Sequence, residues 1–365
     1  MKVGLIGEKL GHSFSKIIHE QIEDYTYDLM PLSREEFPLY MEKKNFDAIN
    51  VTIPYKEVVI PYCDIIDEKA KEIGAVNAIK NVNGKLYATN TDFDGLKWMI
   101  ENHLDIKNKI VAICGSGGTS KTAYAVCKTI GVKEIVRVAR GNKGENYINY
   151  SELQNRKDIE IIINTTSVGM MPDMMSSIVN LDDFPLCEGV IDVVYNPLLT
   201  SLCYQAKVKN IPYICGLEML VGQAVSAIEF FTGKKIERNV IKSITHTLHR
   251  DKQNIVFVDL SDFEKESLAK PLANLFHMNY KEVDTSKDFI YDEIAKINHS
   301  IICCSFGAAK EASHLQALSL NGLIVETNEY LKQELAHMIE KYNANQREHV
   351  TLDEFMEVLY ENTCD

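Results

Sequence analysis

Short apolar segments of strand length alternate with helical patterns along this whole chain. This alternation constrains the fold most, because strands separated by helices pair in parallel and are covered by those helices. We therefore predict an α/β fold, and 365 residues leave room for two or three domains. The expected strands lie within residues 2–7, 46–55, 78–92 (a hairpin turning at Asn83-Gly84), 108–118, 134–140, 159–167, 189–195, 211–216, 254–260, 300–307 and 322–327.

The chain is acidic, with a formal net charge of −13. An acidic surface repels phosphate backbones and anionic lipids, so neither nucleic acid nor a membrane is an expected partner. The first residues have the pattern of a short strand rather than of a secretion signal, and no apolar run is long enough to span a bilayer. The nine cysteines show no C-x-x-C spacing. We expect a cytoplasmic protein without disulfides and without a bound metal.

Residues 109–126, KIVAICGSGGTSKTAYAV, place a glycine-rich turn between a strand pattern and a helix pattern. The phosphate loop of an ATP-dependent enzyme needs glycine where Ser120 stands, because serine adopts a positive φ less readily. A dinucleotide-binding turn needs glycines for the tight turn and for close approach of the pyrophosphate, and Gly115, Gly117 and Gly118 meet that need. We interpret the segment as a dinucleotide site; the alternative is a glycine turn without a ligand.

The strand that follows this turn indicates which dinucleotide is bound. In NAD-binding domains the second strand ends in an acidic residue that contacts the ribose hydroxyl. Here the strand at residues 134–140 ends in Arg140. A basic residue at this point suits the additional phosphate of NADP. We therefore expect NADP as the cofactor.

Polar side chains follow several of the expected strands within the first 93 residues. Each has a structural alternative: Ser13 or Ser15 would cap the next helix, and Lys56 would be a solvated surface lysine. Taken together, hydroxyls, amides, a lysine and a carboxylate at strand ends can also converge on a polyol ligand. The candidates are Ser13, Ser15, Thr52, Lys56, Asn77, Asn90 and Asp92.

Eight segments within residues 1–248 resemble, in order and spacing, the motifs of the shikimate dehydrogenase family. They are GEKLGHSFSKIIHE, INVTIPYKE, IGAVNAI, ATNTDFDG, GSGGTSKTA, INTTSVGM, DVVYNPLLTSL and GLEMLVGQA. The resemblance implies an N-terminal α/β substrate domain, residues 1–93 with 219–248, and a Rossmann-like NADP-binding domain, residues 94–218. It implies the reversible NADPH-dependent reduction of 3-dehydroshikimate to shikimate.

The same resemblance implies roles for individual residues. Lys56 and Asp92 would form the catalytic pair. Substrate would be bound by Ser13, Ser15, Thr52, Asn77, Asn90, Tyr195 and Gln223. Cofactor would be bound by Gly115, Gly117, Gly118, Arg140, Thr165, Val193, Gly216 and Met219. One departure concerns the Asn-Arg-Thr form of NADP-dependent members, which is Ala-Arg-Gly at residues 139–141.

Two other functions remain open. One is an NAD-dependent quinate/shikimate dehydrogenase, which the cofactor preference would distinguish. The other is a non-catalytic sensor of shikimate-pathway metabolites, although the presence of both Lys56 and Asp92 favours an enzyme. Either a monomer or a homodimer fits the sequence.

Residues 252–365 lie beyond this resemblance and resemble, more weakly, the shikimate kinase family. The segment in the place of the phosphate loop, DLSDFEKES at residues 259–267, contains no glycine. Its carboxylates would repel a triphosphate. They belong to Asp259, Asp262, Glu264 and Glu266. We expect a degenerate P-loop-kinase-like α/β domain without kinase activity, joined to the rest of the chain through residues 246–253.

Two remaining features have structural interpretations. Trp98, the single tryptophan, is expected to pack between helices. The methionine-rich run MMPDMM at residues 170–175 is expected to be a mobile loop near the cofactor rather than a metal site.

Overall fold

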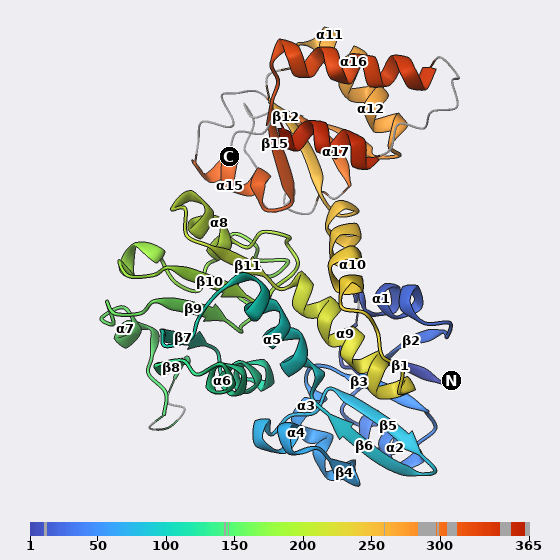
Figure 1. Ribbon diagram of the computed structural model, residues 1–365, viewed down its shortest axis with the longest axis vertical. Coiled ribbons are helices and arrows are strands. Elements are labelled where there is room, and N and C mark those ends of the chain that lie inside the picture. The colour runs from blue at the N-terminus through green and yellow to red at the C-terminus, as the bar shows by residue number, and fades with distance from the viewer. Residues whose placement is uncertain are drawn as a thin grey trace. The chain divides into compact units, whose positions relative to one another are not determined.

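The computed structural model describes residues 1–10, 13–141, 144, 146–258, 260–283, 297, 299–304, 312–343 and 352–361. The chain forms two compact units (Figure 1). The first consists of residues 1–167, 178–195 and 205–247, and the second of residues 168–177, 196–204 and 248–365. The predicted α/β fold is confirmed, because helices alternate with the strands of three sheets in the part of the chain described above.

The first unit begins with a mixed six-stranded sheet in the order β2-β1-β3-β5-β6-β4. β1 pairs in parallel with β2 and β3, whereas β5 runs antiparallel to β3 and β6. The predicted hairpin is confirmed: Asn83 and Gly84 have φ values of 52° and 83°, as a tight type I′ turn requires. The strands are β1 (Val3–Gly7), β2 (Tyr27–Pro31), β3 (Ala48–Val51), β4 (Ile65–Ile66), β5 (Ala78–Val82) and β6 (Lys85–Thr89).

Alternate residues of these strands enter two apolar cores, one on each face of the sheet. Ile49 packs in the core that contains Phe37 of helix α2, and Ala48 packs in the core that contains Phe231 of helix α9. The period of two in a strand therefore explains why both faces are covered. The helices of this part are α1 (Ser15–Ile22), α2 (Glu36–Lys43), α3 (Tyr55–Val58), the 3₁₀ turn η1 (Ile60–Tyr62), α4 (Glu68–Ile73), α5 (Thr91–His103), α9 (Leu217–Thr232) and α10 (Asn239–Arg250).

Helices α5 and α9 pack closely against each other, and glycines allow it. A Cβ on Gly95 would lie 2.6 Å from the carbonyl oxygen of Met219, and one on Gly222 would lie 3.2 Å from the Cα of Gly95. The indole Nε1 of Trp98 on α5 donates a hydrogen bond of 3.1 Å to Glu218 on α9. Trp98 therefore packs between helices, as its sequence context indicated.

The second sheet of this unit is fully parallel, in the order β11-β10-β9-β7-β8. In this sheet β8 lies on one side of β7, and β9, β10 and β11 lie on the other side. In such doubly wound sheets, ligands bind beyond the carboxyl ends of the strands where the strand order reverses, here β7 and β9. The elements are β7 (Ile110–Cys114), α6 (Gly118–Ile130), β8 (Glu134–Val138), α7 (Tyr150–Leu153), β9 (Ile161–Asn164), η2 (Leu181–Asp183), β10 (Gly189–Asp192), α8 (Ser201–Val208) and β11 (Tyr213–Cys215).

The second unit contains a parallel four-stranded sheet in the order β13-β14-β12-β15. Phe257 of β12 faces a core shared with Leu272 and Phe355, and its neighbour Val256 faces an opposite core with Leu318. Helices therefore cover both faces of the sheet. The elements are β12 (Asn254–Val258), α11 (Asp262–Glu264), the π-helical turn η3 (Lys265–Ala269), α12 (Lys270–Leu275), β13 (Asn279–Val283), β14 (Ser300–Cys304), α15 (Ala312–Ser319), β15 (Gly322–Glu326), α16 (Glu329–Asn343) and α17 (Leu352–Glu361).

The described cysteines, from Cys63 to Cys304, are free thiols and most are buried. Burial raises the pKa of the Cys114 thiol to about 12, so this side chain stays neutral and packs as a small apolar group. None of the helices that the structure describes combines the length and the apolar character needed to cross a bilayer.

A buried histidine makes the stability of the first unit dependent on pH. His19 is fully buried, stacks on Tyr27 with ring centres 4.1 Å apart, and places Nδ1 2.7 Å from the hydroxyl of Tyr25. Burial lowers its pKa from 6.5 to about 3. Between these two values the unfolded chain binds more protons than the folded one, so stability is lost as the pH falls below 6.5.

We expect His19→Phe, which keeps an aromatic ring at this position, to reduce this pH dependence. Below pH 6.5, the free energy of unfolding of the wild type should fall by up to about 1.4 kcal/mol per pH unit more than that of the variant. Thermal denaturation of both proteins between neutral and mildly acidic pH measures the difference, and His246→Asn, at an exposed position, is the control. Parallel pH profiles of His19→Phe and wild type would show that His19 does not titrate on unfolding.

Candidate active site

An ion pair between Lys56 and Asp92 lies where two strands of the first sheet end. Lys56 belongs to α3, which follows β3, and Asp92 lies in the first turn of α5, which follows β6. Lys56 Nζ lies 2.6 Å from Asp92 Oδ2, and the two side chains are 17% and 9% exposed. The helix dipole favours a carboxylate in the first turn. Asp92 therefore holds the ammonium group in one position at the edge of the buried region.

Asn77 fixes the second oxygen of the Asp92 carboxylate. Its amide nitrogen donates a hydrogen bond of 2.8 Å to Asp92 Oδ1, and its amide oxygen accepts one of 2.6 Å from the backbone N–H of Thr91. Asn77 is only 2% exposed. Both carboxylate oxygens are thus engaged by protein groups, and the lysine, the carboxylate and the amide form one connected cluster.

Two residues that the sequence analysis did not include continue this cluster into the core. The hydroxyl of Tyr27 donates a hydrogen bond of 2.8 Å to Asn50 Oδ1, and Asn50 Nδ2 donates one of 3.1 Å to the carbonyl oxygen of Asn77. Burial raises the pKa of Tyr27 well above its usual value, so it remains a neutral donor. An asparagine inside an apolar strand was the available signal, because a buried amide requires partners.

Asn90, expected to bind a substrate hydroxyl, bonds to protein groups through both of its polar atoms. Its side-chain oxygen caps α5 by accepting the N–H of Phe93 at 3.1 Å. Its amide nitrogen donates to the carbonyl oxygen of Ala75 at 3.0 Å and approaches Thr122 Oγ1 at 3.4 Å. Asn90 is completely buried. The structure therefore supports a structural role, and substrate binding by Asn90 stays a prediction.

The two N-terminal serines lie at the start of α1. Ser15 does not cap the helix, because it is the first residue of α1; the N-cap residue is Phe14, which makes no side-chain cap. The hydroxyl of Ser13 accepts the N–H of Ser15 at 3.2 Å, so it satisfies one free N–H of the first turn. The ring of Phe14 lies 5.7 Å from that of Tyr195, which follows β10. The fold thus brings together three expected substrate residues, Ser13, Ser15 and Tyr195.

Thr52 directly follows β3, and Gln223 lies on α9. The methyl group of Thr52 would be 2.5 Å from a Cβ on Gly7, so that glycine leaves room for the threonine. Gln223 of α9 contacts α5 near Asp92, since its backbone nitrogen would be 2.7 Å from a Cβ on Gly95. Its amide nitrogen donates to the carbonyl oxygen of Leu220 at 2.9 Å.

The glycine turn lies at the carboxyl ends of β7 and β9, where the order of the second sheet reverses. Gly115 has a φ of 129°, and a Cβ there would lie 2.3 Å from Thr165 Oγ1. Thr165 follows β9, and its hydroxyl donates to the carbonyl oxygen of Cys114 at 2.7 Å. Only glycine satisfies both the backbone conformation and this close approach.

The following helix leaves its N-terminus open. Gly117 is the N-cap of α6, makes no side-chain cap, and has open space where a Cβ would be. Ser120 is fully buried and donates to the carbonyl oxygen of Gly115 at 2.8 Å, so it stabilises the turn. The free N–H groups of a helix N-terminus bind phosphate. A Cβ on Gly118 would be 3.8 Å from Lys56 Cδ, which places the turn beside the ion pair.

The other expected cofactor residues lie at neighbouring strand ends. Arg140 is exposed and follows β8 by two residues. Gly216 approaches Val193 so closely that a Cβ on it would be 2.1 Å from the Val193 carbonyl oxygen. Met219, in the first turn of α9, is buried in the core to which Val193 also belongs.

An ion pair between helices α6 and α3 was not predicted. Lys121 of α6 and Glu57 of α3 form an ion pair of 2.7 Å, with side chains 33% and 46% exposed. Such exposed pairs contribute little to stability. Its position next to Lys56 nevertheless links the glycine helix to the helix that carries the lysine.

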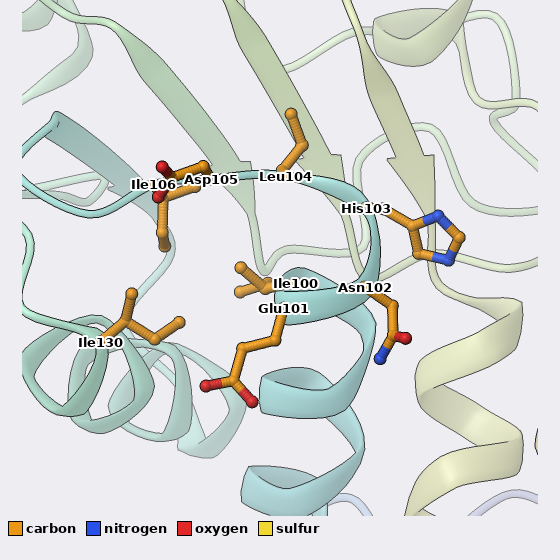
Figure 2. Close-up of a pocket in the computed structure, with 8 residues that line it drawn as sticks. All are labelled: Ile100, Glu101, Asn102, His103, Leu104, Asp105, Ile106 and Ile130. Atoms are coloured by element: carbon orange, nitrogen blue, oxygen red, sulfur yellow. The ribbon is translucent and has the colours of Figure 1, made fainter.

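A hollow of about 330 Å³ lies at the C-terminal end of α5. Figure 2 shows the residues around it. It is lined by Ile100, Glu101, Asn102, His103, Leu104, Asp105, Ile106 and Ile130. None of the residues assigned to substrate or cofactor lines it. This hollow is therefore separate from the site at Lys56 and Asp92.

The site combines two features. A glycine turn lies where the strand order of the parallel sheet reverses, and beside it a lysine–carboxylate pair follows two strands of the mixed sheet. Together they define a dinucleotide-dependent oxidoreductase. The model of the shikimate dehydrogenase substrate binding domain matches residues 5–79, and that of the shikimate 5′-dehydrogenase C-terminal domain matches residues 216–243. The chain belongs to the shikimate dehydrogenase family.

Individual relatives agree with this assignment. A shikimate dehydrogenase (NADP⁺) of Clostridium perfringens is 35% identical over 269 residues, which cover 67% of this chain and 97% of the relative. The crystal structure of shikimate dehydrogenase 1 from Peptoclostridium difficile is 32% identical with a TM-score of 0.63, covering 67% of this chain and 97% of that one. A shikimate dehydrogenase in complex with NADP⁺ is 28% identical with a TM-score of 0.60, covering 67% and 94%.

Proposed function

We propose that this chain catalyses the reversible NADPH-dependent reduction of 3-dehydroshikimate to shikimate. Its curated relatives are named shikimate dehydrogenase (NADP⁺). The observation that carries the proposal is the ion pair of Lys56 and Asp92, held by Asn77 and adjacent to the glycine turn at Gly118. Ketone reduction needs a proton donor at the carbonyl oxygen beside the nicotinamide, and this arrangement supplies one.

The residues at the carboxyl ends of β7 and β9 fit NADP. Gly115 allows the tight approach of the turn to Thr165, Gly117 leaves open space where a Cβ would be, and the uncapped N-terminus of α6 suits a pyrophosphate. Arg140 is exposed at the end of β8, where a cation meets the additional phosphate of NADP. When bound, NADPH supplies the hydride.

The chain's own residues would then handle the proton and the substrate. Lys56 would donate a proton from Nζ to the ketone oxygen of the substrate as that oxygen becomes a hydroxyl, so no free alkoxide would form. In the reverse direction Lys56 accepts that proton. Asp92 holds Nζ at 2.6 Å and Asn77 holds Asp92 at 2.8 Å, so the donor is oriented before the substrate arrives.

Substrate recognition is proposed for the residues around this pair. Ser13 and Ser15, at the start of α1, would bind the substrate carboxylate with the help of the helix N-terminus. Thr52, Gln223 and Tyr195 would surround the hydroxyl groups. Burial raises the pKa of Tyr195, so its hydroxyl remains a hydrogen-bond donor.

The test is the oxidation of shikimate and of quinate with NADP⁺ and with NAD⁺, followed by the absorbance of the reduced nicotinamide. We expect activity with shikimate and NADP⁺, and Arg140→Ala should lower kcat/KM for NADP⁺ by about 10- to 100-fold, the value of a charge-assisted contact, without affecting NAD⁺. Lys107→Ala, also exposed, is the control. A preference for NAD⁺ or quinate would support the quinate/shikimate dehydrogenase, and a folded but inactive chain would support the sensor.

For residues 252–365 we propose a degenerate kinase-like domain. A parallel sheet with helices on both faces supports it, as does the segment after β12. There Ser261 and Glu264 form a capping box, and Glu264 pairs with Lys332 at 2.5 Å. Lys332 and Ser261 together lower the pKa of Glu264 to about 2, so it is charged at neutral pH. A carboxylate that neutralises the nearby cation disfavours a triphosphate.

The expected result is that the purified chain forms no shikimate 3-phosphate from shikimate and ATP. The reason is that carboxylates replace the glycine-rich loop that would bind the phosphates of ATP. Mass spectrometry of the reaction mixture measures it, with an active shikimate kinase in a parallel reaction as the positive control. Detection of ATP-dependent product would contradict the proposal.

The three-domain division, residues 1–93 with 219–248, 94–218 and 252–365, is also a proposal. The compact units support a separate C-terminal part, and they assign residues 168–177 and 196–204 to it. A cytoplasmic location and a monomeric or homodimeric state stay predictions from the sequence.

A further inference from the structure

Two segments of the nucleotide-binding region, one loop and one loop with the first turn of α8, belong to the compact unit of the C-terminal domain. Residues 168–177 follow β9 and begin just after Thr165, and residues 196–204 follow β10 and begin directly after Tyr195. Both belong to the second unit together with residues 248–365. We call these two segments the loop pair.

The loop pair is held together by its own contacts. The N–H of Met171 donates to the carbonyl oxygen of Asn196 at 3.2 Å. The hydroxyl of Ser201, which is 1% exposed, donates to the carbonyl oxygen of Met174 at 2.7 Å. Because each bond joins one loop to the other, the two segments form a single structure.

The turn between α15 and β15 of the C-terminal domain binds this structure through polar contacts. The N–H of Leu199 donates to the carbonyl oxygen of Leu320 at 2.9 Å, and the N–H of Leu198 donates to Asn321 Oδ1 at 2.9 Å. Gln316 Nε2 donates to Ser201 Oγ at 2.9 Å. These bonds engage residues 198–201 along their length.

An apolar contact accompanies these hydrogen bonds and explains the methionine-rich run. Met174 and Leu320 are 1% and 0% exposed and form one cluster, against which Met171 and Met175 pack. The sequence analysis predicted a mobile loop here, whereas in the structure these methionine side chains are packed against Leu320. Flexible methionines fill irregular gaps, and here they fill the gap against Leu320.

We propose that Gln316, Leu320 and Asn321 of the C-terminal domain are positioning residues for the dehydrogenase reaction, because they hold the loop pair. The two segments of the loop pair follow the carboxyl ends of β9 and β10. The expected cofactor and substrate residues Thr165, Val193 and Tyr195 lie at these strand ends. Ligands of open α/β sheets bind at such strand ends, and small misplacements there reduce the rate strongly. This inference rests on the proposed function of those residues.

The degenerate domain thereby acquires a role that needs no kinase chemistry. Asn321 is 4% exposed, and its carbonyl oxygen accepts the N–H of Asn254, the first residue of β12, at 2.7 Å. The turn is thus anchored in the C-terminal sheet. Loss of that anchor would release the loop pair even with every residue of the dehydrogenase part intact.

The test compares two leucine deletions in the full chain. Leu320→Ala removes the contact with Met174, whereas Leu318→Ala, the matched control, removes an equally buried leucine that packs on Val256 and Val258 instead. The first readout is the rate at which hydrogen peroxide oxidises Met174, measured by mass spectrometry. The second is kcat/KM for NADP⁺, with the dissociation constant of NADP⁺ measured separately by titration.

We expect Leu320→Ala to speed Met174 oxidation and to lower kcat/KM for NADP⁺ by about 10- to 100-fold. Leu318→Ala should change neither, even where its melting temperature falls as far. Faster oxidation with unchanged kinetics and cofactor affinity would overturn the proposal, as would equal effects of the two variants. An inactive wild type would refute only the proposed function. Met174 oxidation and NADP⁺ binding would still test whether the turn positions the loop pair.

Discussion

Lys56→Ala is expected to lower kcat for shikimate oxidation by about 10²- to 10⁴-fold, with only a modest change in KM. Lys56 is the cation within the cluster of Asn77 and Asp92, and it lies beside the glycine turn at Gly118. A proton transferred at the reacting oxygen acts on the transition state more than on the bound ground state. Steady-state kinetics with saturating NADP⁺ measure the effect.

Two further variants separate the proton from the charge. Lys56→Arg keeps a cation beside Asp92 but cannot release a proton at neutral pH, so it should remain as impaired as alanine. Lys69→Ala is the matched control, because Lys69 forms a comparable ion pair of 2.7 Å with Asp94 on the same helix as Asp92. Full activity of Lys56→Arg would assign only an electrostatic role to Lys56, and an unchanged kcat in Lys56→Ala would exclude it from catalysis.

Removing one partner of a buried ion pair also affects folding. Such a change costs about 3–5 kcal/mol when it leaves an isolated buried charge. Asn77 still donates to Asp92, and Asp92 lies at the N-terminus of α5, so the loss in Lys56→Ala should stay below that range. Melting temperatures recorded beside the kinetics establish that the variant is folded when its activity is measured.

Gly115→Ala is expected to have the second large effect, a loss of NADP⁺ binding by about 100-fold or more. The added Cβ would lie 2.3 Å from Thr165 Oγ1, and the φ of 129° is one that alanine rarely adopts. The turn must shift to relieve the clash, at a cost of about 1–3 kcal/mol in folding free energy. Titration of the protein with NADPH, followed by fluorescence, measures the affinity.

The matched control for backbone strain is Gly131→Ala. Gly131 ends the same helix with a φ of 84°, but no atom lies within 4 Å of a Cβ at this position. Alanine there should cost about 1–2 kcal/mol of stability through its left-handed conformation and leave the NADP⁺ affinity unchanged. If Gly115→Ala binds NADP⁺ as well as this control, the turn does not bind the cofactor.

The sequence by itself determined the features that depend on neighbouring residues. The alternation of apolar strands and helices specified α/β sheets, and Asn83-Gly84 specified a tight hairpin, because only such residues adopt positive φ readily. Gly115, which has a φ of 129°, marked the turn between β7 and α6 for the same reason. From the residues alone, the polar side chains at strand ends were only a set of candidates, and the family resemblance assigned their roles.

Only the tertiary structure decided which distant residues meet. Tyr27 supports Asn77 through Asn50, although no local pattern relates a tyrosine to an asparagine fifty residues away. Asn90 caps α5, and the methionine-rich run packs on Leu320 from the far end of the chain. Local backbone preferences depend on consecutive residues. Side-chain partners depend on the close packing of the complete core, which no short segment encodes.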